Sequence, residues 1–259
     1  MTHPFKAIVL TGASSGIGAA LVTEMAGPGV HMLLTGRDAS RLDSAAETAH
    51  ANGAMVETAV LDVTDTDALA SRLQAFDAAH PVDLVIANAG VMAGLGPGRS
   101  PEPQGTSRRL IQTNLLGAID TVEPLLPAML ARGTGHIALV SSMAALHPHG
   151  DMPSYSASKA GLRAWGASIR QWLRPRGIAV TVICPGFVTS PMSARHQGFK
   201  PFEIDARDAA RRIVRGLARG RPLITFPWPL AVLIWIGQRL PPRLSDLAAK
   251  GFRATIRPD

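Results

Sequence analysis

Residues 7–18 read AIVLTGASSGIG, a short apolar run that passes directly into a glycine-rich turn. A continuous apolar run of this length is typical of a strand buried on both faces of a parallel sheet. The glycines permit a sharp bend and let the backbone approach a pyrophosphate, and the helical pattern of residues 17–25 places a positive helix N-terminus beside them. The stretch therefore predicts a phosphate-binding turn, although an ordinary strand-to-helix loop can also carry such glycines.

The alternation of strand-like and helix-like segments continues along the chain. Such an order forms right-handed βαβ units, whose ligands bind beyond the carboxyl ends of the strands. We therefore predict an α/β fold, a doubly wound parallel sheet in a single domain over residues 1–259, with a hydrophobic helical extension at its C-terminus. The further strand-like runs are residues 32–35, 55–61, 84–87, 137–141 and 178–183, and the helix-length segments between them are residues 41–51, 66–79, 107–131 and 154–173.

The composition narrows the class of protein and its partners. Of 259 residues, 46% are hydrophobic and 17% charged, which is typical of a globular domain. The net charge of +7 favours an anionic partner, which can be a phosphorylated cofactor, a membrane surface or nucleic acid. Aromatic residues make up only 5% and no nucleic-acid-binding motif occurs, so we expect no nucleic-acid partner. No signal-peptide pattern precedes residues 7–10, so we expect a cytoplasmic protein.

Cysteine and histidine offer little chemistry of their own. Cys184 is the single cysteine and lies in the apolar run 180–185, so we expect a buried structural thiol. His147 and His149 flank Pro148, but no cluster of acids or cysteines accompanies them. We therefore predict no metal site and assign this loop to the border of a substrate pocket, with an apolar wall from residues 143–146.

Polar and glycine-containing motifs follow the other strand-like runs. Asp62-Val63 follows the third run, Asn88-Ala89-Gly90 the fourth, and Pro185-Gly186-Phe187-Val188-Thr189 the sixth. Together with Thr11 and the Gly-x-x-x-Gly-x-Gly spacing of the first turn, these motifs resemble the short-chain dehydrogenase/reductase (SDR) family over roughly residues 5–190. The resemblance implies a Rossmann-type sheet and a nicotinamide dinucleotide as cofactor. It implies cofactor contacts from Gly12, Ser14, Ser15, Gly16, Ile17, Gly18, Asp62, Val63, Asn88, Ala89, Gly90, Pro185, Gly186, Val188 and Thr189.

The choice between NADP(H) and NAD(H) depends on the residues after the second strand-like run. NAD-binding enzymes place a carboxylate there for the ribose 2′-hydroxyl, and it would repel a 2′-phosphate. In register with the family this position is Gly36, and Arg37 follows it, whose guanidinium can pair with a phosphate through two hydrogen bonds. We therefore expect NADP(H), while Asp38 could serve the ribose of NAD(H) in another loop register and Arg37 could be a solvated loop residue.

A tyrosine and a lysine lie four positions apart in the helical segment 154–173. Tyr155 and Lys159 therefore share one face of that helix. A nearby ammonium stabilises a phenolate, so we expect Lys159 to lower the pKa of Tyr155 from its usual value of about 10. Taken singly, these residues can also be a solvated lysine and a structural tyrosine.

The resemblance assigns roles to four catalytic residues. In the family pattern Tyr155 gives a proton to the substrate oxygen as hydride arrives from the nicotinamide, and Ser142 hydrogen-bonds that oxygen. Lys159 also holds the nicotinamide ribose, and Asn114 anchors a water of the proton relay. Taken singly, Ser142 and Asn114 can equally be polar residues that satisfy backbone groups.

The C-terminal third is where the resemblance says least. We assign residues 190–220 to a substrate lid, with Met192, His196, Phe199 and Phe202, and residues 221–259 to an extension that begins with a strand at 223–226. Residues 227–237 are strongly apolar but too short to span a membrane. They can form a core or subunit-interface helix, a cap over the substrate pocket, or a helix lying on an anionic membrane surface. Basic residues follow them at Arg239, Arg243, Lys250, Arg253 and Arg257.

These observations predict an NADP(H)-dependent oxidoreductase that interconverts a carbonyl and an alcohol, with Tyr155 as general acid and base. We expect a hydrophobic, lipid-like small-molecule substrate and a homo-oligomer, a dimer or tetramer, that pairs through segments 107–131 and 154–173. A non-catalytic NADP(H)-binding sensor is the alternative, since fold alone does not establish chemistry. An isomerase, epimerase or dehydratase on the same cofactor fold is a third possibility.

Overall fold

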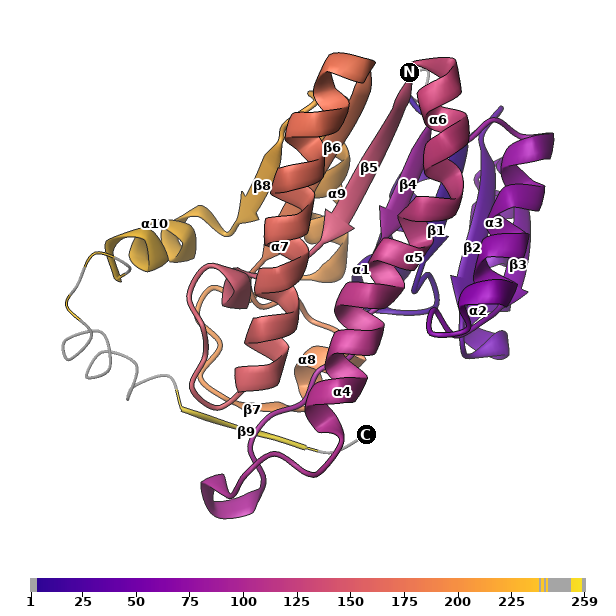
Figure 1. Cartoon of the computed structure of the whole chain (residues 1–259). Helices are drawn as coiled ribbons and strands as arrows, with labels where there is room; N and C mark the ends of the chain where they lie inside the picture. The colour runs from indigo at the N-terminus through magenta and orange to yellow at the C-terminus, as the bar shows by residue number, and fades with distance from the viewer. Residues whose placement is uncertain (1–3, 238, 240, 242–252, 258–259) are drawn as a thin grey trace.

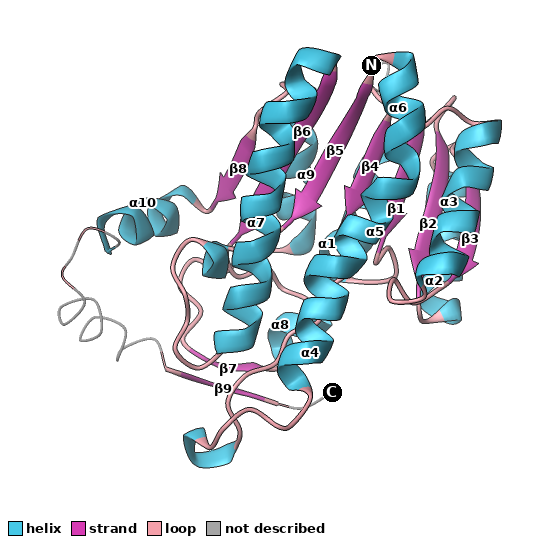
Figure 2. Cartoon of the chain, viewed as in Figure 1, coloured by secondary structure: helices cyan, strands magenta, loops and turns pink. Residues whose placement is uncertain are grey.

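A computed structural model describes residues 4–237, 239, 241 and 253–257. Within them, seven parallel strands form one sheet in the order β3-β2-β1-β4-β5-β6-β8 (Figure 2). The order reverses between β1 and β4, which makes this the switch point of a doubly wound sheet, as predicted. The strands are β1 (Ala7–Thr11), β2 (His31–Gly36), β3 (Met55–Val60), β4 (Leu84–Ala87), β5 (Gly135–Val140), β6 (Ile178–Pro185) and β8 (Leu223–Phe226).

Helices cover both faces of the sheet, which explains the continuous apolar character of its strands. In β1, Ile8 and Leu10 pack in one core cluster with α1 (Gly16–Met25), α2 (Ala39–Ala51) and α9 (Ala206–Ala218). Val9, which lies between them, packs in the opposite cluster. Because alternate side chains of a strand point to opposite faces, both sets must be apolar. The second cluster is completed by α3 (Thr66–Ala79), α5 (Gly117–Val122), α6 (Leu126–Arg132) and α7 (Pro153–Leu173).

The predicted helical segment 107–131 is not one regular helix. It comprises α4 (Thr106–Ile111), a π-helical turn at Gln112–Leu116, α5, a 3₁₀ turn at Glu123–Leu125, and α6. Pro124 and Pro127 lie where the second interruption occurs, and proline removes a backbone donor of the regular helix. The π turn is a local widening of the kind found at functional sites, and it contains Asn114.

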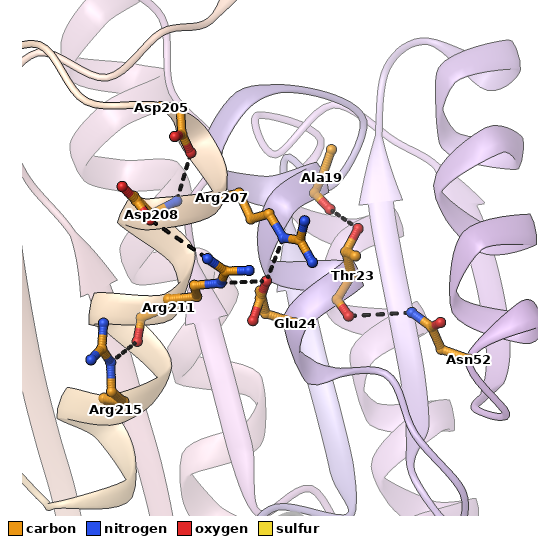
Figure 3. A network of polar contacts seen from close by, with 9 residues as sticks. All are labelled: Ala19, Thr23, Glu24, Asn52, Asp205, Arg207, Asp208, Arg211 and Arg215. Carbon is orange, nitrogen blue, oxygen red and sulfur yellow. Dashed lines mark hydrogen bonds and ion pairs between the residues drawn. The ribbon is translucent and has the colours of Figure 1, made fainter.

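Helix α9 belongs to the core layer, although its sequence lies within the segment assigned to the lid. Its Ala209, Ala210 and Ile213 are fully buried in the first cluster. On its outer side, the guanidinium Nε atoms of Arg207 and Arg211 lie 3.1 and 3.3 Å from Glu24 Oε1 of α1 (Figure 3). These contacts fix α9 against α1, so the lid expectation is wrong for this helix and remains a proposal for the residues before it.

The C-terminal segments gather around the carboxyl ends of the strands. After α8 (Pro191–Ala194) comes β7 (His196–Gly198), which pairs antiparallel with β9 (Ala254–Ile256). The short helix α10 (Trp228–Gly237) projects from the end of β8 away from the sheet (Figure 1). Within the described ranges, no helix combines the length and apolar character needed to cross a bilayer. Arg243 and Lys250 lie outside the described residues.

Candidate active site and cofactor cleft

A cavity of about 1060 Å³ opens at the carboxyl ends of the strands. Its walls come from the turn after β1, the ends of β2 to β6, the N-terminal turn of α7, and α10. This volume is at the upper end of the range of small-molecule and cofactor sites. The cavity therefore lies where a doubly wound sheet binds its ligand and has room for a dinucleotide together with a substrate.

The glycines after β1 are required by steric contacts. Gly12 and Gly16 have positive φ angles of 66° and 54°. A Cβ at Gly12 would lie 2.8 Å from Ala89 Cα, and a Cβ at Gly18 would lie 2.0 Å from Gly12 O. The turn is therefore packed against the end of β4 and against the first turn of α1. Gly12, Ser14, Ser15, Gly16 and Ile17 line the cavity, whereas Gly18 allows the close packing beneath it.

Asn88 fixes this turn from the neighbouring strand. Its Nδ2 donates hydrogen bonds to Thr11 O at 3.1 Å and to Gly12 O at 3.0 Å. In return, Thr11 Oγ1 accepts from the backbone N–H groups of Asn88 and Ala89, each at 3.2 Å. The Asn88-Ala89-Gly90 motif thus stabilises the sheet and, with all three residues lining the cavity, presents its backbone to the site.

Two arginines border the cavity beside Gly36. Arg37 is 66% exposed, and its Nη1 lies 3.5 Å from Asp62 Oδ2. Arg41, on the first turn of α2, also lines the cavity. Its backbone N–H and its Nε donate to Asp38 at 3.0 and 2.8 Å, so Asp38 caps α2 and is paired. Arg41 was not identified from the sequence. Its position three residues after a potential helix-capping aspartate could have indicated that its side chain folds back toward the end of β2.

Asp62 and Val63, which the resemblance assigns to the cofactor, also line the cavity. Partial burial acts to raise the pKa of Asp62, but hydrogen bonds from Thr64 and the charge of Arg37 outweigh it, and the pKa lies below its ordinary value. The carboxylate is therefore ionised at neutral pH. Its Oδ1 accepts from Thr64 N at 3.0 Å and from Thr64 Oγ1 at 2.8 Å, which holds the side chain in one orientation.

Tyr155, Lys159 and Ser142 lie together at the inner end of the cavity. The buried Lys159 donates from Nζ to Val140 O at 2.9 Å, and burial lowers its pKa to about 8. Burial raises the pKa of Tyr155, and a hydrogen bond with the Ser142 side chain offsets this only in part. The expected lowering of the tyrosine pKa is therefore wrong for this structure, because burial outweighs the favourable contacts. The phenol is protonated at neutral pH.

Asn114 connects these elements from behind the cavity wall. Its Oδ1 accepts from Val91 N at 2.7 Å, and its Nδ2 donates to Val91 O at 2.9 Å and to Ser158 Oγ at 3.0 Å. A Cβ at Gly90 would lie 3.1 Å from Asn114 Oδ1 and 3.3 Å from Lys159 Nζ. Asn114 is fully buried and does not line the cavity, so its visible role is to join the end of β4 to α7.

The stretch at the end of β6 places three of its four expected cofactor-contacting residues at the cavity. Pro185, Gly186 and Val188 line the cavity, but the exposed Thr189 does not. The reason is that Thr189 donates its backbone N–H to Ile204 O at 2.9 Å, as part of a short parallel pairing. Cys184, which precedes the loop, is buried as expected, and burial raises the pKa of its thiol to about 11.

The outer part of the cavity has an apolar wall and a histidine wall. Met143 and Ala144 line it, but Ala145 and Leu146 do not, and neither does Phe202. Apolar side chains from Met192, Phe199, Leu230, Leu233, Ile234 and Ile236 complete that wall. His147, His149 and the buried His196 also line the cavity. In the described part of the chain, no three histidine, cysteine or acidic residues are grouped so that they could hold a metal ion.

Comparison with known proteins identifies the family. The short chain dehydrogenase family model matches residues 6–199. An uncharacterized oxidoreductase of Myxococcus xanthus is 39% identical over 250 residues, which are 96% of this chain and 98% of that protein. The chain therefore belongs to the short-chain dehydrogenase/reductase family of oxidoreductases.

Two solved structures place nucleotide-bound relatives beside this fold. A metagenomic short-chain oxidoreductase in complex with NADP is 31% identical, with a TM-score of 0.71 over 85% of this chain and 94% of that one. A short-chain dehydrogenase/reductase from Burkholderia phymatum in complex with NAD has a TM-score of 0.80, with 23% identity over 92% of this chain and 95% of that one. Relatives thus bind either dinucleotide, and the fold alone does not choose between them.

Proposed function

We propose that this protein is an NADP(H)-dependent reductase of hydrophobic ketones or aldehydes, in which Tyr155 donates the proton. The observation that carries the proposal is geometric: Tyr155, hydrogen-bonded to the Ser142 side chain, and the buried Lys159, held through its Nζ by Val140 O, line one cavity with the glycine-rich turn. A phenol that keeps its proton at neutral pH suits carbonyl reduction, in which the substrate oxygen must gain a proton.

The residues present fit a nicotinamide dinucleotide. Gly12 and Gly16 leave room for a pyrophosphate close to the backbone, and the side chains of Ser14 and Ser15 line the same place. When bound, the nicotinamide supplies the hydride that adds to the carbonyl carbon. The carboxamide would contact the later residues of the stretch 185–189, of which Val188 lines the cavity, and Asp62 and Val63 would hold the adenine, as the family resemblance implies.

Positive charge beside Gly36 favours NADP(H) over NAD(H). A 2′-phosphate at this position would meet the guanidinium groups of Arg37 and Arg41, and charged hydrogen bonds of this kind are strong. Asp38 is already occupied by Arg41, so it is poorly placed to accept from a ribose hydroxyl. A side chain at Gly36 would begin 3.0 Å from Ser14 Oγ, so the Ser14 side chain would have to shift to admit the family's NAD-type carboxylate.

The protein side of the reaction moves one proton. The Ser142 and Tyr155 hydroxyls hydrogen-bond the carbonyl oxygen and orient it. As the carbon gains hydride, Tyr155 gives its proton to this oxygen, which becomes the alcohol hydroxyl, and the phenolate left behind is stabilised by the positive charge of Lys159. A proton from solvent then restores the phenol. Asn114 keeps α7 and the end of β4 in register, and we assign it the family's water-anchoring role as part of the proposal.

The test is consumption of NADPH by the purified protein over ketones and aldehydes graded from polar to long-chain, with NADH in parallel. We expect turnover with NADPH, weak response to NADH, and activity that rises with chain length. Binding of NADPH with no turnover of any carbonyl, or of the corresponding alcohols with NADP⁺, would favour a nucleotide sensor. Conversion of a substrate without net change in nicotinamide absorbance would favour an isomerase, epimerase or dehydratase.

We further propose a homo-oligomer that pairs through segments 107–131 and 154–173, which contain α4 to α6 and α7, as the resemblance implies. The exposed apolar Leu116 lies in the π turn between α4 and α5 and is suited to such a contact. Light scattering on the eluting protein tests this proposal directly, and a monomer at all concentrations contradicts it.

A further inference from the structure

Helix α10 is apolar on every side and yet exposed. Its sequence, WPLAVLIWIG, contains no charged or hydroxyl side chain, and such a helix is ordinarily buried. Here only Leu230 is buried, whereas Trp228 is 71% and Trp235 57% exposed. Large exposed apolar side chains grouped on one element mark an interaction surface. We call this surface, formed by Trp228, Val232 and Trp235, the α10 patch.

The patch lies on the back of a cavity wall. Leu230, Leu233, Ile234 and Ile236 of the same helix line the cavity, whereas Trp228, Val232 and Trp235 do not. With 3.6 residues per turn, these two sets lie on opposite sides of α10, one toward the site and one outward. The two sides are separated only by the width of the helix, about 10–12 Å. Whatever covers the α10 patch is therefore adjacent to the outer part of the cavity.

Positive charge accompanies the patch. The exposed Arg239 places its guanidinium 3.4 Å from the centroid of the Trp235 ring, and its Nη1 donates to Trp235 O at 2.7 Å. A second arginine, Arg253, precedes β9 and lines the cavity that α10 also borders. Tryptophan beside arginine is the combination favoured at the headgroup level of a bilayer, where the ring is half immersed and the cation meets lipid phosphate.

We propose that the α10 patch binds the surface of an anionic lipid bilayer, with Trp228, Val232 and Trp235 inserted at headgroup depth and the cavity opening next to the lipid. The length of α10 permits lying in the interface but not crossing it. A second copy of the chain is the less suitable occupant, because a symmetric contact sets the same patch against itself and would bring two Arg239 guanidinium groups together. The proposed membrane contact is independent of the proposed reaction. Direct entry of a substrate from the lipid, by contrast, rests on the proposed function.

The binding test uses the full chain and sedimentation with vesicles of phosphatidylcholine alone or of equal parts phosphatidylcholine and phosphatidylglycerol. We expect stronger binding to the anionic vesicles that weakens with salt. Replacing both patch tryptophans (Trp228→Ser with Trp235→Ser) should weaken binding by at least about tenfold, because each loses a buried aromatic surface. Brominated lipid should quench the fluorescence of the wild-type protein and quench the double variant far less.

The chain contains a matched control for this variant. Trp172 is also exposed and also has an arginine over its ring, with the Arg176 guanidinium 5.5 Å from the centroid, but it lies at the far end of α7. Trp172→Ser should bind vesicles like the wild type. Equal losses in both variants, equal binding to both lipid compositions, or no binding by the wild type would overturn the proposal. An oligomer that dissociates only in the double variant would assign the patch to a second copy.

A final arm separates the membrane contact from the reaction. With a long-chain ketone dissolved in anionic vesicles, the double variant should lose turnover, while reduction of a short, water-soluble ketone should match the wild type. Vesicle binding without turnover of any carbonyl leaves the membrane contact in place and contradicts the proposed function. Turnover of the vesicle-borne ketone that is unchanged in the double variant contradicts entry from the lipid.

Discussion

The turn after β1 and helix α10 border the same cavity, but they are built under opposite constraints. At Gly12 and Gly18 an added Cβ would meet backbone atoms at 2.8 and 2.0 Å, so those positions admit one residue type. Along α10 the outward side chains meet solvent, and many apolar residues would serve equally. The proposed cofactor end is therefore defined by backbone fit. The proposed substrate end is defined by apolar surface, which suits a class of ligand and not one molecule.

The largest effect should come where the two ends meet, at Tyr155. Replacing it with phenylalanine removes the proton donor and little volume, so kcat should fall by about 10² to 10⁴. NADPH binding, measured by fluorescence titration, should stay within a few-fold of the wild type. A Tyr155→Phe variant that retains most of its turnover would mean that another group donates the proton.

The buried Lys159 should produce the next largest effect, in stability. Its pKa is about 8 when folded and 10.5 in the reference state. Between these values the unfolded chain binds a proton that the folded protein does not, so the free energy of unfolding should rise from pH 8 to 10.5 by up to about 3 kcal/mol. Below pH 8 this contribution is flat. Denaturant titrations should show that Lys159→Met lacks the rise, and identical pH profiles for the two proteins would contradict the burial of the ammonium.

At the proposed cofactor end, replacing Arg37 and Arg41 tests whether their positive charge sets the preference for NADPH over NADH. Each charged hydrogen bond is worth about 1.5–3 kcal/mol, or about 10- to 100-fold in affinity. The variant with Arg37→Ala and Arg41→Ala should therefore raise the KM for NADPH by at least this factor and leave that for NADH little changed. Arg215→Ala, an exposed arginine of α9, is the control for loss of positive charge. Equal increases for both nucleotides would mean that the arginines do not meet the 2′-phosphate.

The smallest effect is expected on α10, as a change in specificity. Leu233 lines the cavity and the adjacent Val232 does not. Losing part of one apolar contact costs about 1 kcal/mol, so Leu233→Ala should raise the KM for a long-chain ketone several-fold and leave a short-chain ketone unaffected. Val232→Ala is the matched control in water, without vesicles. If the two variants behave alike, α10 does not form a wall of the substrate site.

The sheet and the cofactor end were largely predictable, because local sequence and local structure coincide there. The runs at 84–87 and 223–226 match β4 and β8, and 66–79 matches α3. The structure differs from the sequence-based prediction where contacts between distant segments determine the local structure. The segment 107–131 breaks at a π turn and at prolines, α9 packs into the core through contacts with α1, and β9 pairs with β7 across more than fifty residues. Its three-residue strand carries too short a pattern to be detected in the sequence.

The fold, the glycine-rich turn after the first strand and the shared helix face of Tyr155 and Lys159 could be predicted from the sequence, because spacing along a strand or helix fixes which residues share an edge or a face. The role proposed for Ser142 came from the family resemblance. The remaining features of the site depend on tertiary contacts. Burial raises the pKa of Tyr155, and the hydrogen bond from Arg41 to Asp38 holds Arg41 at the cavity. Asn114 lies behind the cavity wall, and α10 has one side on the cavity and one side facing outward. Burial and charge at a site depend on elements far apart in the chain, and no local pattern encodes them.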